Sequence, residues 1–359
     1  MVVFFTALRL AAQPAEHWVG TWGCAPQLTE PTNMPPAPGL SGNTLRQTVR
    51  TTIGGARLRL HFSNLFGDGP LTMKSVRLND TALAFHGAAS ATIPAGEAIV
   101  SDPFDYELAP MSDLAITIRF GDVPAKVTGH PGSRSTSLLQ GAKVTHWYVL
   151  TGIDVLAPAG TSEIVVLGDS VTDGRGSTTD GNDRWTDDLA RRLRAPISVL
   201  NEGLGGNAVL AGGLGPPAVL RFDRDVLGQN APRWLIVLEG VNDIGVSYSP
   251  SIAADLIAAY GQFIEKAHAH NIRVYGVPIL PFGKSMYSSP EHEAARQTVN
   301  EWIRTSGKFD AVIDMDSAVH DPTEPSNLLA AYDTGDHLHP NAAGYQKMAD
   351  AIDLSLFKP

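Results

Sequence analysis

The alternation of hydrophobic and polar residues divides the chain into two parts with different periods. Between residue 17 and about residue 155, several short runs have apolar side chains at every second position, which is typical of strands with one buried face. The clearest runs are 45–53, 57–62, 114–120 and a last strand at 144–155. Gly54-Gly55 separates the first two runs and predicts a two-residue hairpin turn. Several short strands with regular turns predict a β-sandwich or jelly roll.

Beyond about residue 160 the period changes, and short continuous apolar runs alternate with helical patterns. The apolar runs are 164–167, 197–200, 235–238, 274–280 and 311–314, and the helical patterns are 185–194, 251–270, 290–305 and 340–356. Pro340 is expected at the first position of the last helix, where proline is tolerated. Strands that alternate with helices form a parallel sheet with helices on both faces. We therefore predict an all-β domain over 17–156, the linker 157–160, and an α/β domain over 161–359.

Composition and charge narrow the class of protein. A length of 359 residues favours two domains, and 43% hydrophobic with 18% charged residues is typical of a globular chain. The net charge of −10 and the lack of Lys/Arg runs argue against nucleic acid as a partner. After the N-terminus, no stretch approaches the ~20 apolar residues of a membrane span, so no integral membrane association is expected. The single cysteine, Cys24, allows no intrachain disulfide.

Residues 1–16 begin with a short apolar stretch that is followed by small residues. We interpret this segment as a clipped secretory signal, although it lacks a basic start and Arg9 interrupts the apolar run. The alternative is an irregular N-terminal extension. A signal would make the protein secreted or periplasmic, and without one it would be cytoplasmic.

Four polar blocks lie after predicted strands or before the last helix. They are Gly168-Asp169-Ser170, the Gly-rich segment 201–207, Glu239-Gly240-Val241-Asn242-Asp243, and Asp336-His337-Leu338-His339-Pro340. Ligands bind at the carboxyl ends of strands in open α/β sheets, and a serine hydroxyl needs a base to become nucleophilic. His339 can take the proton of Ser170, and Asp336 can orient the imidazole from three residues away, which gives the triad order Ser-Asp-His. The alternatives are an ordinary turn at Ser170 and a loop histidine that caps the last helix.

These four blocks, in this order, resemble the SGNH hydrolases, also called the GDSL esterase/lipase family, over about residues 161–357. Val171 stands where the family name has leucine, which exchanges one apolar residue for another. The resemblance implies a flavodoxin-like three-layer sandwich and a serine esterase without metal or cofactor. It also implies that the oxyanion donors are the N–H groups of Ser170 and Gly206 and the side chain of Asn242, with the N–H of Gly205 as the alternative to that of Gly206. A plain tight turn at 205–206 and a turn-forming Asn242 are the alternatives.

Other residues carry weaker predictions. Four are expected to contact substrate: Asp169, Gly205, Phe282 and His337. Asp169 is also expected to order its own turn, Asp173 to cap or brace the following turn, and His337 to lie at the rim of the pocket. The polar loop 130–135 either reaches the mouth of the site or is solvated.

Two segments of the β domain resemble the N-terminal halves of larger bacterial and fungal SGNH esterases. They are His17-Trp18-Val19-Gly20-Thr21-Trp22 and His61-Phe62-Ser63-Asn64. Many of those enzymes act on decorated carbohydrates. The leading hypothesis is therefore a serine esterase that hydrolyses short acyl esters, above all acetyl esters, of small molecules or carbohydrates. The alternatives are a lipase or lysophospholipase of the same family and an inactive carbohydrate-binding protein. A metallophosphoesterase is disfavoured because too few Asp and His residues lie at sheet ends. The oligomeric state is not predicted.

Overall fold

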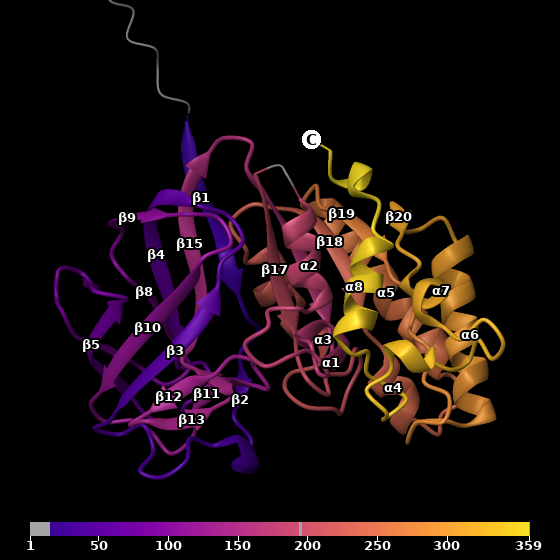
Figure 1. The fold of residues 1–359 in the computed structure, drawn as a ribbon, viewed down its shortest axis with the longest axis horizontal. Coiled ribbons are helices and arrows are strands. Elements are labelled where there is room, and N and C mark those ends of the chain that lie inside the picture. The colour runs from indigo at the N-terminus through magenta and orange to yellow at the C-terminus, as the bar shows by residue number, and fades with distance from the viewer. Residues whose placement is uncertain (1–14, 194–195, 359) are drawn as a thin grey trace, which may run out of the picture.

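The computed structural model describes residues 15–193 and 196–358, and it shows an antiparallel β region followed by an α/β region (Figure 1). Most of the predicted signal segment, residues 1–14, lies outside the described residues. Strand β1 (Glu16–Gly23) opens the β region, and β15 (Leu150–Pro158) closes it. The first parallel strand, β16 (Ser162–Gly168), starts four residues later.

Three antiparallel sheets make up the β region. The strands between β1 and β15 are β2 (Gln27–Leu28), β3 (Thr44–Arg50), β4 (Gly55–Ser63), β5 (Leu71–Leu78), β6 (Thr81–Ala82), β7 (Ala91–Ile93), β8 (Ala98–Val100), β9 (Phe104–Leu108), β10 (Asp113–Phe120), β11 (Thr128–Pro131), β12 (Ser137–Leu139), β13 (Ala142–Val144) and β14 (His146–Tyr148). The first sheet has the order β1-β15-β4-β8, with β9 on β4. The second has the order β13-β12-β3-β10-β5-β6, with β7 on β5, and the third is β14-β11-β2. The alternating apolar residues of the first two sheets share one core, as in a sandwich.

The hairpin predicted at Gly54-Gly55 is wrong. Strand β3 pairs with β10 and β12, whereas β4 pairs with β15, β8 and β9, so this turn carries the chain from one sheet to another. Neither glycine has a positive φ, which the expected hairpin turn requires. A Cβ on Gly54 would lie 2.3 Å from the carbonyl oxygen of Leu108. Close approach of the backbone, and not turn geometry, therefore explains glycine at position 54.

The single strand predicted at 144–155 is also wrong. Strands β13, β14 and β15 divide this stretch among three sheets. Val149, between β14 and β15, has a φ of +68°, a conformation that a β-branched residue rarely adopts. The chain changes sheets at this residue, which the alternation of side chains does not reveal.

The α/β region confirms the predicted flavodoxin-like fold. Its remaining strands are β17 (Ile197–Gly203), β18 (Pro232–Leu238), β19 (Arg273–Gly276) and β20 (Ala311–Val312). All pairs are parallel, and the order β17-β16-β18-β19-β20 places the first strand between the second and third, as in flavodoxin-like sheets. The carboxyl ends of β16, β17 and β18 therefore meet at one edge.

Helices cover both faces of this sheet and make the predicted three layers (Figure 1). They are α1 (Ser170–Asp173), α2 (Trp185–Arg192), α3 (Ala218–Phe222), α4 (Val241–Val246), α5 (Ile252–Ala269), α6 (Pro290–Thr305), α7 (Met315–Val319) and α8 (Ala342–Asp350). Residues of α3, α4, α5 and α6 share a core with one face, and residues of α2, α7 and α8 share a core with the other. Among the helices in the described residues, none has the length and apolar character needed to cross a bilayer.

Pro340 does not begin the last helix as predicted. Asn341 caps α8, because its side-chain oxygen accepts the N–H of Gly344 at 3.0 Å, and Pro340 precedes this cap. The helix ends at Asp350, and a separate 3₁₀ turn covers Leu354–Phe357. The asparagine cap therefore takes precedence over the proline as the start signal.

The β region packs directly on the edge of the parallel sheet, where β1 lies against β17. The N–H of Gly20 in β1 donates to Oε1 of Glu163 in β16 at 2.5 Å. A Cβ on Gly20 would lie 2.9 Å from Leu200, and one on Gly23 would lie 2.7 Å from Glu202. The two glycines let the backbone of β1 approach the side chains of β16 and β17.

Candidate active site

Ser170 lies at the tight junction between β16 and α1. Asp169 caps the helix by accepting the N–H of Val171 at 2.9 Å, and Gly174, with a φ of +102°, ends it. A Cβ on Gly168 would lie 2.2 Å from Oγ1 of Thr172, so only glycine allows the helix to start this close to the strand. These contacts fix the Ser170 hydroxyl at the carboxyl edge of the sheet.

The structure brings Ser170, His339 and Asp336 into one hydrogen-bonded chain. Oγ of Ser170 lies 2.8 Å from Nε2 of His339, and Nδ1 of the same ring lies 2.7 Å from Oδ2 of Asp336. The other Asp336 oxygen accepts the N–H groups of Leu338 at 3.0 Å and His339 at 2.9 Å. The backbone of the loop thus orients the Asp336 carboxylate, and the carboxylate orients the His339 ring. Nε2 of this ring is then free to accept the proton of the Ser170 hydroxyl.

The surroundings favour a neutral imidazole beside an ionised carboxylate. Burial lowers the pKa of His339, and the hydrogen bond and charge of Asp336 offset only part of this effect. For Asp336, burial opposes ionisation, but hydrogen bonds from the His339 N–H and ring, with that from Leu338, hold its pKa below the usual range. At neutral pH the pair is therefore arranged to accept a proton at Nε2 of His339.

The predicted oxyanion donors lie in the loops that follow β17 and β18. Gly206 has a φ of +72°, and no acceptor among the described residues binds its N–H. Nδ2 of Asn242 donates to the carbonyl of Asn207 at 2.7 Å, and the Tyr287 hydroxyl donates to Oδ1 of Asn242 at 3.0 Å. These two bonds fix the orientation of the amide, and they use only one of its two hydrogens. Asn242 also ties its own loop to that of Gly206.

Replacement of Asn242 by alanine is expected to lower kcat by a factor on the order of 10²–10³, because one donor to the developing oxyanion is lost. KM should change little, since the donor acts mainly in the transition state. Steady-state hydrolysis of p-nitrophenyl acetate measures both constants. The matched control is Asn341→Ala, which removes the cap of α8 instead. Equal kcat values for the Asn242 variant and the wild type would contradict the role.

Ser170 lines a cleft of about 470 Å³ whose walls come from both regions of the chain. Ser170, Gly205, Gly206 and Leu214 line it from the α/β region. The β region supplies Gln27, Glu30, Asn33, Gly132, Arg134 and His146. Of the two alternatives for loop 130–135, the structure shows the first, because part of this loop lines the cleft.

Of the four predicted substrate contacts, only Gly205 lines this cleft. Asp169 is buried as the cap of α1, and burial, opposed by the Val171 N–H, raises its pKa to about 7. Phe282 packs in the core beside α5 and α6, because the segment after β19 turns inward. His337 points to Asp333, with Nδ1 2.6 Å from Oδ2 of that residue, in a loop conformation with a φ of +62°.

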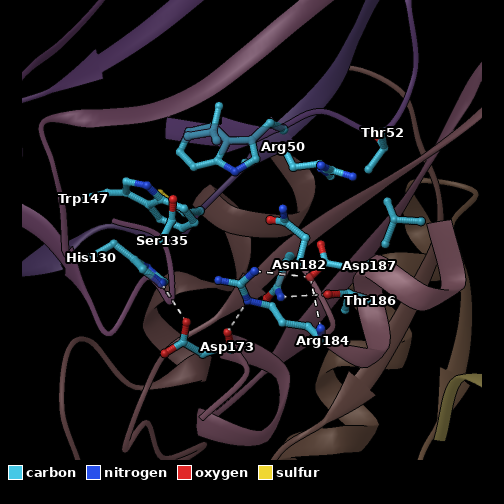
Figure 2. Close-up of a pocket in the computed structure, with 16 residues that line it drawn as sticks. Arg50, Thr52, His130, Ser135, Trp147, Asp173, Asn182, Arg184, Thr186 and Asp187 are labelled. Carbon is cyan, nitrogen blue, oxygen red and sulfur yellow. Dashed lines mark hydrogen bonds and ion pairs between the residues drawn. The ribbon is translucent and has the colours of Figure 1, made fainter. Parts of the chain in front are cut away.

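A set of contacts around Asp173 joins the β region to α1, and it was not predicted in detail (Figure 2). Buried His130 binds Oδ1 of Asp173 through Nε2 and the carbonyl of Ala25 through Nδ1, both at 2.9 Å. Nε of Arg184 donates to the carbonyl of Asp173 at 2.7 Å, and its guanidinium lies over the ring of Trp147. Asp173 is three residues from Ser170, so these contacts hold α1 against the β region. In the sequence, the only sign of these contacts was Asp173, which was expected to cap or brace the following turn.

Arg221 also positions the site, and no motif in the sequence marks it. Its buried guanidinium donates to the carbonyls of Gly168 at 2.9 Å and Glu202 at 2.7 Å, and to Oδ1 of Asn207 at 2.9 Å. These acceptors lie at the ends of β16 and β17 and in the Gly-rich loop that follows β17. One side chain therefore fixes the relative positions of the serine block and the Gly-rich block.

Within residues 15–193 and 196–358, no cluster of three or more His, Cys, Asp or Glu side chains is arranged to hold a metal ion.

Comparisons with known proteins give one family match and several similar solved structures. Residues 166–347, just over half of the chain, match the GDSL-like Lipase/Acylhydrolase family. A GDSL-like lipase from Bacteroides thetaiotaomicron is 18% identical over 55% of this chain and 88% of its own, with a TM-score of 0.41. A member of the lipolytic protein G-D-S-L family from Veillonella parvula is 18% identical over 55% and 98%, with a TM-score of 0.40. A family two carbohydrate esterase from Clostridium thermocellum, solved with cellohexaose, is 13% identical over 87% and 90%, with a TM-score of 0.40. No curated protein sequence matches the chain.

Proposed function

Because the chain belongs to the GDSL-like lipase/acylhydrolase family, whose members hydrolyse esters, we propose that it is a serine esterase with the triad Ser170, His339 and Asp336. The observation that carries the proposal is the continuous hydrogen-bonded chain from Asp336 through His339 to Ser170. It ends in a cleft that a substrate can enter.

In the proposed reaction, Oγ of Ser170 attacks the ester carbonyl while its proton passes to Nε2 of His339. The N–H groups of Ser170 and Gly206 and the free amide hydrogen of Asn242 bind the oxyanion. His339 then gives the proton to the leaving alkoxide, and an acyl group remains on Ser170. Water attacks this acyl-enzyme with the same base, which releases the acid and restores the hydroxyl. Asp336 keeps Nδ1 protonated and stabilises the imidazolium during both steps.

We propose that the acyl group is short, most simply acetyl, and that the alcohol is a sugar. Two glycines, Gly205 and Gly206, lie beside the nucleophile in the cleft lining. Asn33, Thr145 and His146 give the opposite wall hydrogen-bonding groups that suit hydroxyls. Leu214 is the only large aliphatic side chain among the described residues that line the cleft. A long acyl chain would therefore find no second large aliphatic side chain to pack against in this lining.

A series of p-nitrophenyl esters of increasing chain length, together with acetylated sugars, tests this proposal. The expected result is the highest kcat/KM for acetyl, a decline with each lengthening, and labelling of Ser170 by a fluorophosphonate. A kcat/KM that rises with chain length would indicate a lipase. Glycan binding without hydrolysis or labelling would indicate an inactive carbohydrate-binding protein.

The pH dependence of kcat/KM follows from the shifted pKa of His339. The base must be neutral, and burial destabilises the imidazolium and lowers this pKa. The rate should therefore fall only as the pH drops through a value below about 6.5, the ordinary pKa of histidine. Asp336 stays ionised in this range because its own pKa is lowered. An acid limb centred above 6.5 in a pH series with p-nitrophenyl acetate would disprove this assignment.

A further inference from the structure

We propose that the natural ester substrate carries a carboxylate, as an acylated sugar acid does, and that Arg134 and Arg175 bind it. This inference rests on the proposed esterase function and specifies the substrate of the same cleft. It starts from the two arginines that line the cleft together with Ser170.

The two side chains reach the cleft from different regions of the chain. Arg134 belongs to the loop after β11 and is half-buried, whereas Arg175 follows α1 and is exposed. A substrate in the cleft is thus flanked by one cation from the β region and one from the turn beside the nucleophile.

Neither guanidinium has an ion-pair or hydrogen-bond partner among residues 15–193 and 196–358. By contrast, Arg221 and Arg296 are buried and paired with carboxylates, at 3.1 Å from Asp225 and 2.7 Å from Asp316. Arginines that stabilise the fold are therefore satisfied within the protein. The two cleft arginines keep their donors available to a ligand.

The backbone holds Arg134 in place at some conformational cost. Its φ of +50° is uncommon for a residue with a side chain, and such conformations persist where the surroundings impose them. The carbonyl of Arg134 accepts the N–H of Asp180 at 2.9 Å, and Oγ of the adjacent Ser135 donates to the carbonyl of Thr48 at 2.8 Å. The side chain thus leaves a fixed backbone beside the cleft.

The acidic groups near the cleft already have partners. Glu30 accepts hydrogen bonds from the side-chain amides of Gln27 and, at 2.9 Å, of Asn33. Asp173 binds His130, and Asp336 binds His339. The charges of Arg175 and Arg134 reach the catalytic base, since both add to the effect of burial in lowering the pKa of His339. Glu30 and Asp173 also line the cleft, so what distinguishes the two arginines is that neither forms an ion pair with a carboxylate among the described residues.

A carboxylate suits this arrangement better than a neutral group does. The planar fork of arginine pairs with carboxylate or phosphate oxygens through charge-assisted hydrogen bonds. The neutral donors and acceptors of Asn33, Thr145 and His146 suit the hydroxyls of a sugar, and a cleft of about 470 Å³ holds a molecule of sugar size. Two arginines beside neutral hydrogen-bonding side chains therefore favour an acylated sugar acid as the substrate.

The test compares three acetylated sugars that differ at one position. An O-acetyl glucuronate carries the carboxylate, O-acetyl glucose is neutral, and O-acetyl glucose 6-phosphate carries a phosphate. For the wild type, kcat/KM for the glucuronate should exceed that for the neutral sugar about 10-fold or more, as expected for hydrogen bonds to a charged group. This ratio should fall in Arg134→Gln and Arg175→Gln and approach one in the double variant. It should also fall as salt is added.

The control variant is Arg119→Gln, because Arg119 is exposed on β10, away from the cleft lining. It removes the same charge and should leave the ratio unchanged. A wild-type ratio near one, or an unchanged ratio in the double variant, overturns the inference while the esterase proposal stands. A higher kcat/KM for O-acetyl glucose 6-phosphate than for O-acetyl glucuronate overturns the assignment of a carboxylate to the substrate. Failure to hydrolyse any of these esters and p-nitrophenyl acetate overturns both proposals.

Discussion

Replacement of Ser170 by alanine is expected to lower kcat for p-nitrophenyl acetate by about 10⁶-fold, the loss typical of removing the nucleophile of a serine triad. Without Oγ no acyl-enzyme forms, and the remaining donors only bind the substrate. The fold should be unaffected, because the cap of α1 is made by the Asp169 side chain and the Val171 N–H. Stopped assays with high enzyme concentration and a thermal melt measure the two effects.

The matched control is Ser177→Ala. Ser177 is a buried serine seven residues downstream, and its hydroxyl has no partner among the described residues. This variant should keep a kcat close to that of the wild type. Substantial turnover by the Ser170 variant, with the same fluorophosphonate labelling as the wild type, would refute the assignment of Ser170.

Replacement of Asp336 by asparagine is expected to lower kcat by about 10⁴-fold. Asparagine keeps the shape and can still accept the backbone N–H groups that now bind Oδ1 of Asp336. Its amide nitrogen, however, would donate to Nδ1 of His339. The ring would then carry its proton on Nε2 and could not accept the one from Ser170.

Asp333→Asn provides a closely matched control. Asp333 binds Nδ1 of His337 at 2.6 Å, much as Asp336 binds Nδ1 of His339 at 2.7 Å. The two aspartates are three residues apart, but only His339 contacts Oγ of Ser170. Steady-state assays of both variants should show a large loss for Asp336→Asn alone. A larger loss for Asp333→Asn than for Asp336→Asn would contradict the role of Asp336.

The sequence alone predicts the parallel sheet and the members of the triad, because both depend on local signals. Apolar runs mark the buried strands, and short polar blocks such as Gly168-Asp169-Ser170 mark their ends. Parallel strands bring these ends to one edge, so residues 169 positions apart, Ser170 and His339, can be placed together without coordinates. Their roles remain predictions that the proposed variants test.

Other features depend on contacts that no local pattern encodes. The Gly54-Gly55 pair has the composition of a hairpin turn, yet its strands pair with different partners because the sandwich must close. Phe282 follows a strand end, but its ring contributes to the core and not to the cleft. Arg221 carries no recognisable motif, since its importance comes from three acceptors that only the folded chain brings together.

The contact of β1 with β17 also has a consequence for how this protein can be divided. Residues 161–359 contain every member of the triad, which makes them an obvious choice for separate expression. Strand β17 is the outer strand of the parallel sheet, however, and an uncovered outer strand invites aggregation. Such a fragment would also lose Gly20 as the donor to Glu163 and His130 as the partner of Asp173. Directed evolution, domain exchange and crystallisation should therefore treat the β region and the hydrolase region as one inseparable catalytic unit.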